Sequence, residues 1–94
     1  MKNEIKYPKT FETKRELENW LDSYDIQHKD CYVFRNSDYV YTDLKGFDHL
    51  FRNGKELTKG LEVTWVCSFD SGEWAYEDME GNLHRVGKDN NLIR

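Results

Sequence analysis

Thiols and imidazoles are the side chains of this chain with the greatest capacity for chemistry, and their spacing first tests for a metal site. His28 and Cys31 stand in an H-x2-C spacing, whereas Cys67 and His84 lie far from them in the sequence. Structural zinc sites usually combine two closely spaced pairs of ligands. Because only one such pair is present, we expect separate structural roles for these residues and no metal or other cofactor.

Nucleophilic catalysis is the second kind of chemistry to test, and it needs a base within hydrogen-bond reach of the nucleophile. Cys31 or Cys67 could serve as the nucleophile with His49 or His84 as its base, but neither cysteine lies in a local sequence typical of thiol enzymes. None of the serines lies in a G-x-S-x-G motif. The glycines are spread singly, which excludes the glycine-rich loops that bind phosphates. We therefore expect a protein that is not an enzyme.

The segment 70–80 concentrates both charge and aromatic rings. It holds five acidic residues and no basic one, interleaved with Trp74 and Tyr76. One interpretation is a solvated hairpin in which these two rings fill the core. The other is an acidic hairpin that docks on a basic partner, because acidic residues steer association and aromatic residues anchor it. The candidate partner-binding residues are Asp70, Glu73, Trp74, Tyr76, Glu77, Asp78 and Glu80.

The charge balance indicates which kinds of partner this chain favours. Lys and Arg total 14 and Asp and Glu total 18, so the net charge is -4. Nucleic acids and anionic membranes are bound largely through Lys and Arg, and the basic residues here are scattered among acidic ones. We therefore expect a protein partner with a basic surface, and we disfavour nucleic acid and membrane.

The distribution of apolar residues gives an expectation for location. No apolar run approaches the roughly 18 residues of a transmembrane helix. The first ten residues contain no hydrophobic stretch typical of a signal peptide. We expect a cytoplasmic protein, in which the two cysteines are free thiols.

The elements that position these residues begin with one amphipathic helix. Thr13 and Glu16 form a capping-box pattern. Four apolar residues then recur at helical spacing, which predicts a helix over 14–24. They are Leu17, Trp20, Leu21 and Tyr24. Residues 1–10, which contain Pro8, are expected to form an irregular lead-in.

The period changes to 2 after this helix, which predicts strands. Two strands over 31–35 and 38–42 are joined by a turn near Asn36 and Ser37, with one long bulged strand as the alternative. A two-residue loop gathers aromatic residues on one face of this hairpin. They are Tyr32, Phe34, Tyr39 and Tyr41.

A second group of strands is predicted over 61–69, from residue 74 onward and over 83–86. An even-numbered loop places Phe69 opposite Trp74 and keeps Trp65 on the same core-facing side. A three-residue loop at 80–82 pairs Met79 with Leu83.

The stretch 44–60 is ambiguous. Asn53 and Gly54 are a strong hairpin signal but also a normal helix end. The spacing of Phe47, Leu50 and Phe51 favours a short helical excursion near 47–53.

The sum of these elements is an α+β fold. We expect one N-terminal amphipathic helix packed on a small antiparallel meander sheet of four to five strands, as a thin two-layer body. Residues 1–94 form a single domain whose tail over 88–94 frays, and no internal repeat is expected.

The function expected from these features is that of a small acidic, non-catalytic protein-binding module. Within that class we expect an inhibitor, such as a bacterial immunity protein, an antitoxin or a phage-encoded inhibitor of a host nuclease or defence enzyme. The alternative is a binder of single-stranded nucleic acid or nucleotides that uses an aromatic sheet face. A homodimer through a strand edge is left open.

Overall fold

The computed structural model describes residues 6–34, 38–69, 72–87 and 92–93. It contains one helix and two antiparallel four-stranded sheets, which confirms the α+β class and the single N-terminal helix. Each sheet is a meander whose strands follow sequence order. The elements are α1 (Lys14–Ser23), β1 (Asp30–Val33), β2 (Tyr39–Thr42), β3 (Asp48–Arg52), β4 (Lys55–Glu56), β5 (Val63–Ser68), β6 (Trp74–Asp78), β7 (Leu83–Val86) and β8 (Leu92–Ile93).

Helix α1 begins where the sequence predicts it. The Thr13 hydroxyl accepts a hydrogen bond from the Glu16 backbone N–H at 3.1 Å, and the Glu16 carboxylate accepts one from the Glu12 N–H at 3.1 Å. These two bonds satisfy N–H groups that have no partner within the helix. Leu17 and Leu21 lie on the buried face of α1.

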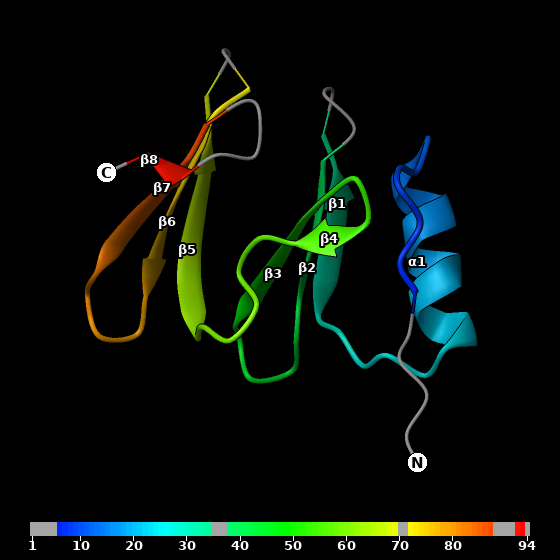
Figure 1. Ribbon diagram of the computed structural model, residues 1–94. Helices are drawn as coiled ribbons and strands as arrows, with labels where there is room; N and C mark the ends of the chain where they lie inside the picture. Colours follow the sequence, from blue (N-terminus) through cyan, green and yellow to red (C-terminus); the bar gives the residue numbers. More distant parts are fainter. Residues whose placement is uncertain (1–5, 35–37, 70–71, 88–91, 94) are drawn as a thin grey trace.

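The molecule has three layers: α1, the first sheet (β1–β4) and the second sheet (β5–β8) (Figure 1). One core lies between α1 and the first sheet, and a second core lies between the two sheets. The expectation of two layers is therefore wrong, because the first sheet is covered on both faces. The buried residues of the second core are Val40, Leu50, Val63, Trp74, Tyr76 and Val86.

Residues 48–52 form strand β3, so the predicted helical excursion near 47–53 is wrong. Asn53 and Gly54 have φ values of 56° and 78°, which is the geometry of a two-residue type I′ hairpin turn. Leu50 packs toward the second sheet while Phe51 packs toward α1. A strand buried on both faces carries consecutive apolar residues, which resemble a helical pattern in a short segment.

The register of the first hairpin differs from the prediction by one residue. Phe34 N–H donates to the Asp38 carbonyl at 2.8 Å, and Val33 pairs with Tyr39. A shift of one residue moves side chains to the opposite face. Tyr39 and Tyr41 therefore face α1, and the predicted four-aromatic face does not form. Its turn at 36–37 lies outside the described residues.

The second hairpin also has an odd loop instead of the predicted even one. Phe69 N–H donates to the Glu73 carbonyl at 2.9 Å, and Ser68 pairs with Trp74. A bulge between Val63 and Trp65 then changes the face of the strand. Val63 is buried, whereas Trp65 and Phe69 are exposed.

The third hairpin has the predicted three-residue loop, but it begins one residue earlier. Asp78 N–H donates to the Asn82 carbonyl, and Glu77 pairs with Leu83, where the prediction placed Met79 opposite Leu83. The pairing is shifted by two residues, so each side chain stays on its predicted face.

The two sheets are copies of one unit, which corrects the expectation that the chain has no internal repeat. The pattern Y-x-D-x-x-G-x-x-H occurs from Tyr41 to His49 and again, 35 residues later, from Tyr76 to His84. The strand pairings repeat with the same offset. The equivalent pairs are Val33↔Tyr39 with Ser68↔Trp74, and Tyr39↔Phe51 with Trp74↔Val86.

The turn inside each copy repeats at the level of single hydrogen bonds. In the first copy, Asp43 Oδ1 accepts from the N–H groups of Lys45 and Phe47 at 2.9 and 3.0 Å, and Gly46 has a φ of 94°. In the second copy, the same bonds run to Asp78 Oδ1 at 3.0 and 2.9 Å. The donors there are Glu80 and Asn82, and the equivalent glycine is Gly81, with a φ of 89°. Identical turns on identical registers show that the chain is a two-unit repeat.

Candidate functional site

Three of the predicted partner-binding residues are interior. Trp74 and Tyr76 are buried between the sheets, so they support the fold from inside. Asp78 is buried too, where Oδ2 accepts from His84 Nε2 at 3.0 Å. The hydrogen bonds from His84 and from the Asn82 backbone lower the pKa of Asp78.

The other predicted residues are at or near the surface. Glu73 and Glu77 are half-buried on the face of the second sheet that points away from the first sheet, and Glu80 is exposed in the β6–β7 turn. Asp70 lies outside the described residues. The structure therefore brings two of the predicted carboxylates together on one face.

We call this face the outer face. Strand register places three cross-strand rows on it, and its three largest apolar members are well exposed: Trp65 at 47%, Phe69 at 42% and Leu83 at 62%. Sequence reasoning assigned Trp65 and Phe69 to the core because the β5 bulge and the odd loop leave no clear signal. The described residues of the outer face are Trp65, Cys67, Phe69, Glu73, Ala75, Glu77, Leu83 and Arg85.

The charges on the outer face are arranged in two groups. Glu77 lies in register between Trp65 and Leu83, and it forms no ion pair with the described residues. Glu73 pairs with Arg85 at 3.3 Å, and the Arg85 guanidinium carbon lies 6.0 Å from the Phe69 ring centroid. A carboxylate flanked by an exposed indole suits a cationic side chain, which can contact both groups.

A buried polar network fixes the outer face relative to the rest of the molecule. Arg52 Nη2 and Nε donate to the Asp38 carboxylate at 2.7 and 3.0 Å, and Trp74 Nε1 donates to the same carboxylate at 2.6 Å. Arg52 also donates to the carbonyls of Gly72 and Gly87. Asp38 and Arg52 belong to the first unit, whereas Trp74, Gly72 and Gly87 belong to the second. The network therefore joins the two units.

His49 lies at the centre of a second polar cluster. Its Nδ1 is 2.7 Å from Glu56 Oε2, its Nε2 is 2.9 Å from Asp43 Oδ2, and its ring stacks on Tyr41. Both ring nitrogens face carboxylates, which are hydrogen-bond acceptors. The imidazole can donate to both of them at once only when both nitrogens carry a proton. The hydrogen bond to Glu56 raises the pKa of His49, burial opposes this, and Asp43 adds to the increase.

This cluster makes stability depend on pH above the ordinary histidine range. A raised folded-state pKa stabilises the fold fully below the unfolded value of about 6.5, and this contribution is lost as pH rises through the folded value. We expect the free energy of unfolding to fall as pH rises from about 6.5 through the higher folded-state pKa of His49, by about 1.4 kcal/mol per unit of pKa difference. Urea denaturation across this range measures it.

His49→Gln should flatten that pH dependence. His28→Gln is the matched control, because His28 forms its described hydrogen bond with the backbone carbonyl of Ile26. Equal pH profiles for the wild type and His49→Gln would show that the cluster contributes nothing to the dependence.

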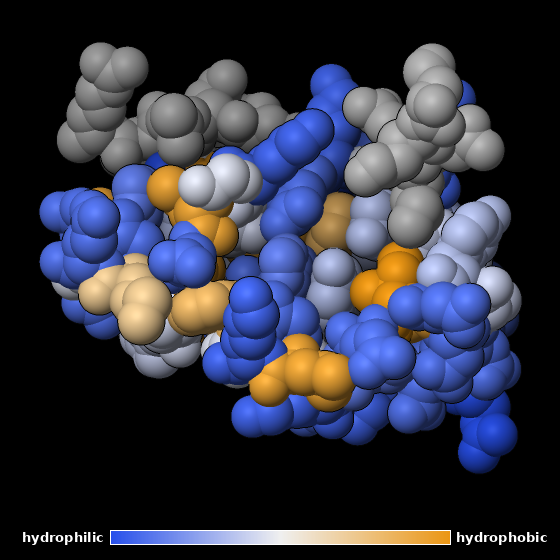
Figure 2. Space-filling view, turned by 90° about the horizontal axis from the view of Figure 1, so that it is seen from below, coloured by the Kyte–Doolittle hydropathy of each residue, from blue (hydrophilic) through white to orange (hydrophobic). Residues whose placement is uncertain are grey.

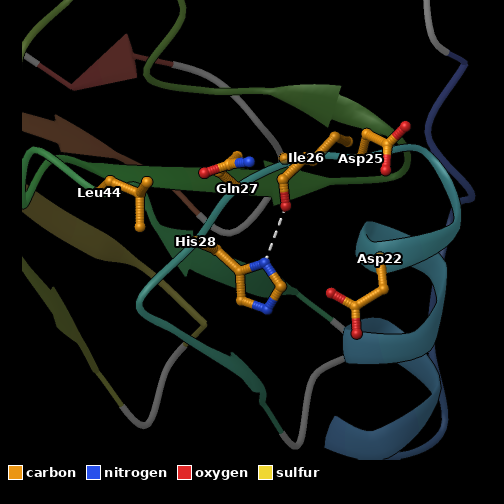
Figure 3. Close-up of a pocket in the computed structure, with 6 residues that line it drawn as sticks. All are labelled: Asp22, Asp25, Ile26, Gln27, His28 and Leu44. Atoms are coloured by element: carbon orange, nitrogen blue, oxygen red, sulfur yellow. Dashed lines mark hydrogen bonds between the residues drawn. The ribbon is translucent and has the colours of Figure 1, made fainter.

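A shallow groove lies at the end of the molecule where α1 meets β1 and β2 meets β3. One part, of about 260 Å³, is lined by Asp22, Asp25, Ile26, Gln27, His28 and Leu44 (Figure 3). The adjoining part, of about 430 Å³, shares Gln27 and Leu44 and also reaches His49. This end is mostly hydrophilic, with hydrophobic residues in separate patches (Figure 2). The two parts differ in lining: the first is mainly polar, whereas the second is mainly apolar and contains Leu44, Phe47 and Leu61.

The residues first considered for metal or thiol chemistry do not converge. Among the described residues, no group of three or more His, Cys, Asp and Glu side chains has the arrangement of a metal site. Cys31 is a buried free thiol whose pKa is raised by burial, and Cys67 is a half-buried free thiol. A raised pKa disfavours the thiolate that nucleophilic chemistry needs.

The fold and the exposed face together define a class: a helix-capped stack of two repeated β-meanders, with one sheet face on which no further layer packs among the described residues. Comparisons with protein-family models, curated proteins and solved structures found no match to this chain. Within the described residues, no helix has the length and apolar character needed to cross a bilayer.

Proposed function

We propose that this protein is a non-catalytic protein-binding module that docks the outer face of its second sheet on a partner protein with a basic surface. The observation that carries the proposal is the exposure of Trp65, Phe69 and Leu83 on one face that also holds Glu73 and Glu77. Exposed aromatic residues are typical anchors of interfaces, and carboxylates beside them select a basic partner.

The small size and acidity of the chain favour an inhibitor within this class, acting in the cytoplasm. An immunity protein, an antitoxin or a phage-encoded inhibitor of a nuclease or defence enzyme presents carboxylates to a surface that binds phosphates. Glu73 and Glu77 are the residues of the acidic hairpin that can do this from the outer face. Trp74 and Tyr76 supply the scaffold for the same hairpin.

Nucleic-acid binding is the less favoured function. Of the tyrosines on which that alternative depended, Tyr39 and Tyr41 are buried under α1 and the N-terminal segment, and only Tyr32 is exposed. The aromatic residues that are exposed on the outer face lie beside carboxylates instead of a basic groove. Single-stranded nucleic acid needs both a stacking ring and positive charge.

Site-specific cross-linking tests the proposal. The full-length protein carrying p-benzoylphenylalanine in place of Trp65 should cross-link a basic protein in a lysate of the source cell. The same photoreactive residue in place of Tyr24, which is exposed on the C-terminal end of α1, is the control position. The cross-linked protein is then identified by mass spectrometry, purified, and titrated with the wild-type chain.

Charge reversal on the outer face should weaken the purified complex by about tenfold at low salt and by less at high salt. Glu77→Lys makes this change, and Glu18→Lys on the exposed side of α1 is a control with the same change in net charge. Loss of binding in both variants, or in neither, contradicts docking through the outer face. So does cross-linking that is equal from both positions, or a captured species that proves to be nucleic acid.

A further inference from the structure

The repeat shows how a sheet face of this kind is occupied, because the first copy already has a neighbour on it. With the offset of 35 residues, Phe69 is equivalent to Phe34 and Glu73 is equivalent to Asp38. Phe34 and Asp38 are on the face of the first sheet that contacts the second sheet. Phe69 and Glu73 are on the outer face, where no further sheet follows among the described residues.

In the first copy, these two residues recognise one side chain, the indole of Trp74. The Phe34 ring meets it edge to face at 4.7 Å and an interplanar angle of 87°. The Asp38 carboxylate accepts the Trp74 Nε1 proton at 2.6 Å. A ring edge and an anionic acceptor together satisfy both parts of an indole, its apolar surface and its N–H group.

The second copy keeps a phenylalanine and a carboxylate at these positions, with Glu73 in place of Asp38, and the same backbone pairing. The backbone bond from Phe69 N–H to the Glu73 carbonyl is 2.9 Å, against 2.8 Å for Phe34 and Asp38. Phe69 remains substantially exposed, although Arg85 reaches over it and pairs with Glu73. Arg85 therefore shows that Glu73 accepts an N–H donor beside Phe69, and an incoming donor that packs on the exposed ring would compete with Arg85 for this carboxylate.

We propose that Phe69 and Glu73 form a receptor for a tryptophan side chain presented by a strand of the partner protein. This inference rests on the proposed function, because it assigns the partner's contact on the same outer face. A second copy of this chain is the less suitable occupant. Its Trp74 is fully buried, and its outer face brings Glu73 and Glu77 against the same carboxylates.

A hairpin peptide provides a direct probe, since Phe34 and Asp38 of the first copy contact the hairpin of this chain that carries Trp74. The peptide copies residues 72–87, which carry Trp74, and is closed by a disulfide between two added terminal cysteines. It is titrated into the isotope-labelled full-length protein. We expect saturable binding with amide shifts centred on Phe69 and Glu73.

Two variants isolate the indole N–H. Tryptophan to phenylalanine in the peptide should weaken binding to the wild-type protein by about tenfold, because a hydrogen bond to a charged acceptor is lost. On Glu73→Ala protein, the two peptides should bind equally. Arg85→Ala protein should bind the tryptophan peptide severalfold more tightly, because the competing donor is removed.

Several results would overturn the inference. They are absence of saturable binding, equal affinity of the two peptides for the wild type, and shifts centred on Val40 and Leu50, which would indicate strand exchange into the core. Self-association of the protein through Phe69, measured by sedimentation, would also overturn it. If the cross-linked partner depends on Glu77 but binds Phe69→Ala protein unchanged, the proposed function stands and the tryptophan receptor fails.

Discussion

Replacing Arg52 with methionine should lower the free energy of unfolding by about 3–5 kcal/mol, because the substitution removes a buried cation that is ion-paired with the Asp38 carboxylate. The side chains of Arg52 and Asp38 are only 8% and 4% exposed. The carbonyls of Gly72 and Gly87 lose their Arg52 donors as well. Domains of this size have about 5–15 kcal/mol in total, so the variant should be close to unfolding. Urea denaturation measures the loss.

Arg85→Met is the matched control, since Arg85 forms an exposed pair with Glu73 that should contribute about 0–1 kcal/mol. Asp38→Asn should cost nearly as much as Arg52→Met, because it leaves the Arg52 cation without its anion. The double variant should cost clearly less than the sum of the two. Additive losses, or an Arg52→Met loss equal to that of Arg85→Met, would refute a coupled buried network.

This network connects stability to the proposed interface. Arg52 is the side chain through which the first sheet holds the carbonyls of Gly72 and Gly87, at the two ends of the β6–β7 hairpin. That hairpin carries Glu73, Glu77 and Leu83 on its outer side. A substitution of Arg52 should therefore disturb the outer face although Arg52 does not lie on it. Loss of partner binding in such a variant would not locate the interface, so binding is tested with substitutions on the outer face itself.

Local signals in the sequence were sufficient for the helix. The Thr13–Glu16 cap and the apolar spacing act within a few residues, so both survive in the structure. Strands β1, β2, β5, β6 and β7 were also placed correctly in outline, but β3 was predicted as a helical turn and the pairing of the strands was wrong. Register depends on loop length, and an odd loop ending in a left-handed glycine, such as Gly72, has the same sequence signal as an even one until the pairing is known.

The outer face was missed for the same reason. Alternation over 61–69 predicts that Trp65 and Val63 share a face, but the bulge between them places Val63 in the core and Trp65 in solvent. The repeat had a readable signal, the spacing of tyrosine, aspartate, glycine and histidine at 41–49 and 76–84. The remaining positions within it differ, so hydrophobic patterning alone did not reveal it.

The buried network had no signal of its own in the sequence. Asp38 and Arg52 are 14 residues apart, and both are residue types that are usually exposed at the surface. They become interior only because the second sheet packs on the first. A two-layer body of one helix on one sheet has no such contact between sheets, so the expected fold placed both residues at the surface. Tertiary contacts between units thus determine the burial of these charges.

Gly54→Ala should be more damaging than Gly46→Ala, with a loss of about 2–5 kcal/mol in the free energy of unfolding. Gly54 has a φ of 78°, and an added Cβ would lie 2.7 Å from the Tyr7 carbonyl oxygen. Both the left-handed backbone and the displaced N-terminal segment then contribute. That segment stacks Tyr7 on Phe51 at 4.2 Å and accepts the Tyr39 hydroxyl proton at the Pro8 carbonyl.

Gly46→Ala separates the two contributions. Gly46 has a φ of 94°, but an added Cβ would meet nothing within 4 Å. The free energy of unfolding should therefore fall only by the backbone strain, about 1–2 kcal/mol. Both variants are compared by urea denaturation, and tyrosine fluorescence reports displacement of the N-terminal segment. Equal losses would mean that the segment moves aside freely. A larger loss for Gly54→Ala would show that residues 7–8 are a fixed part of the cover over the first sheet.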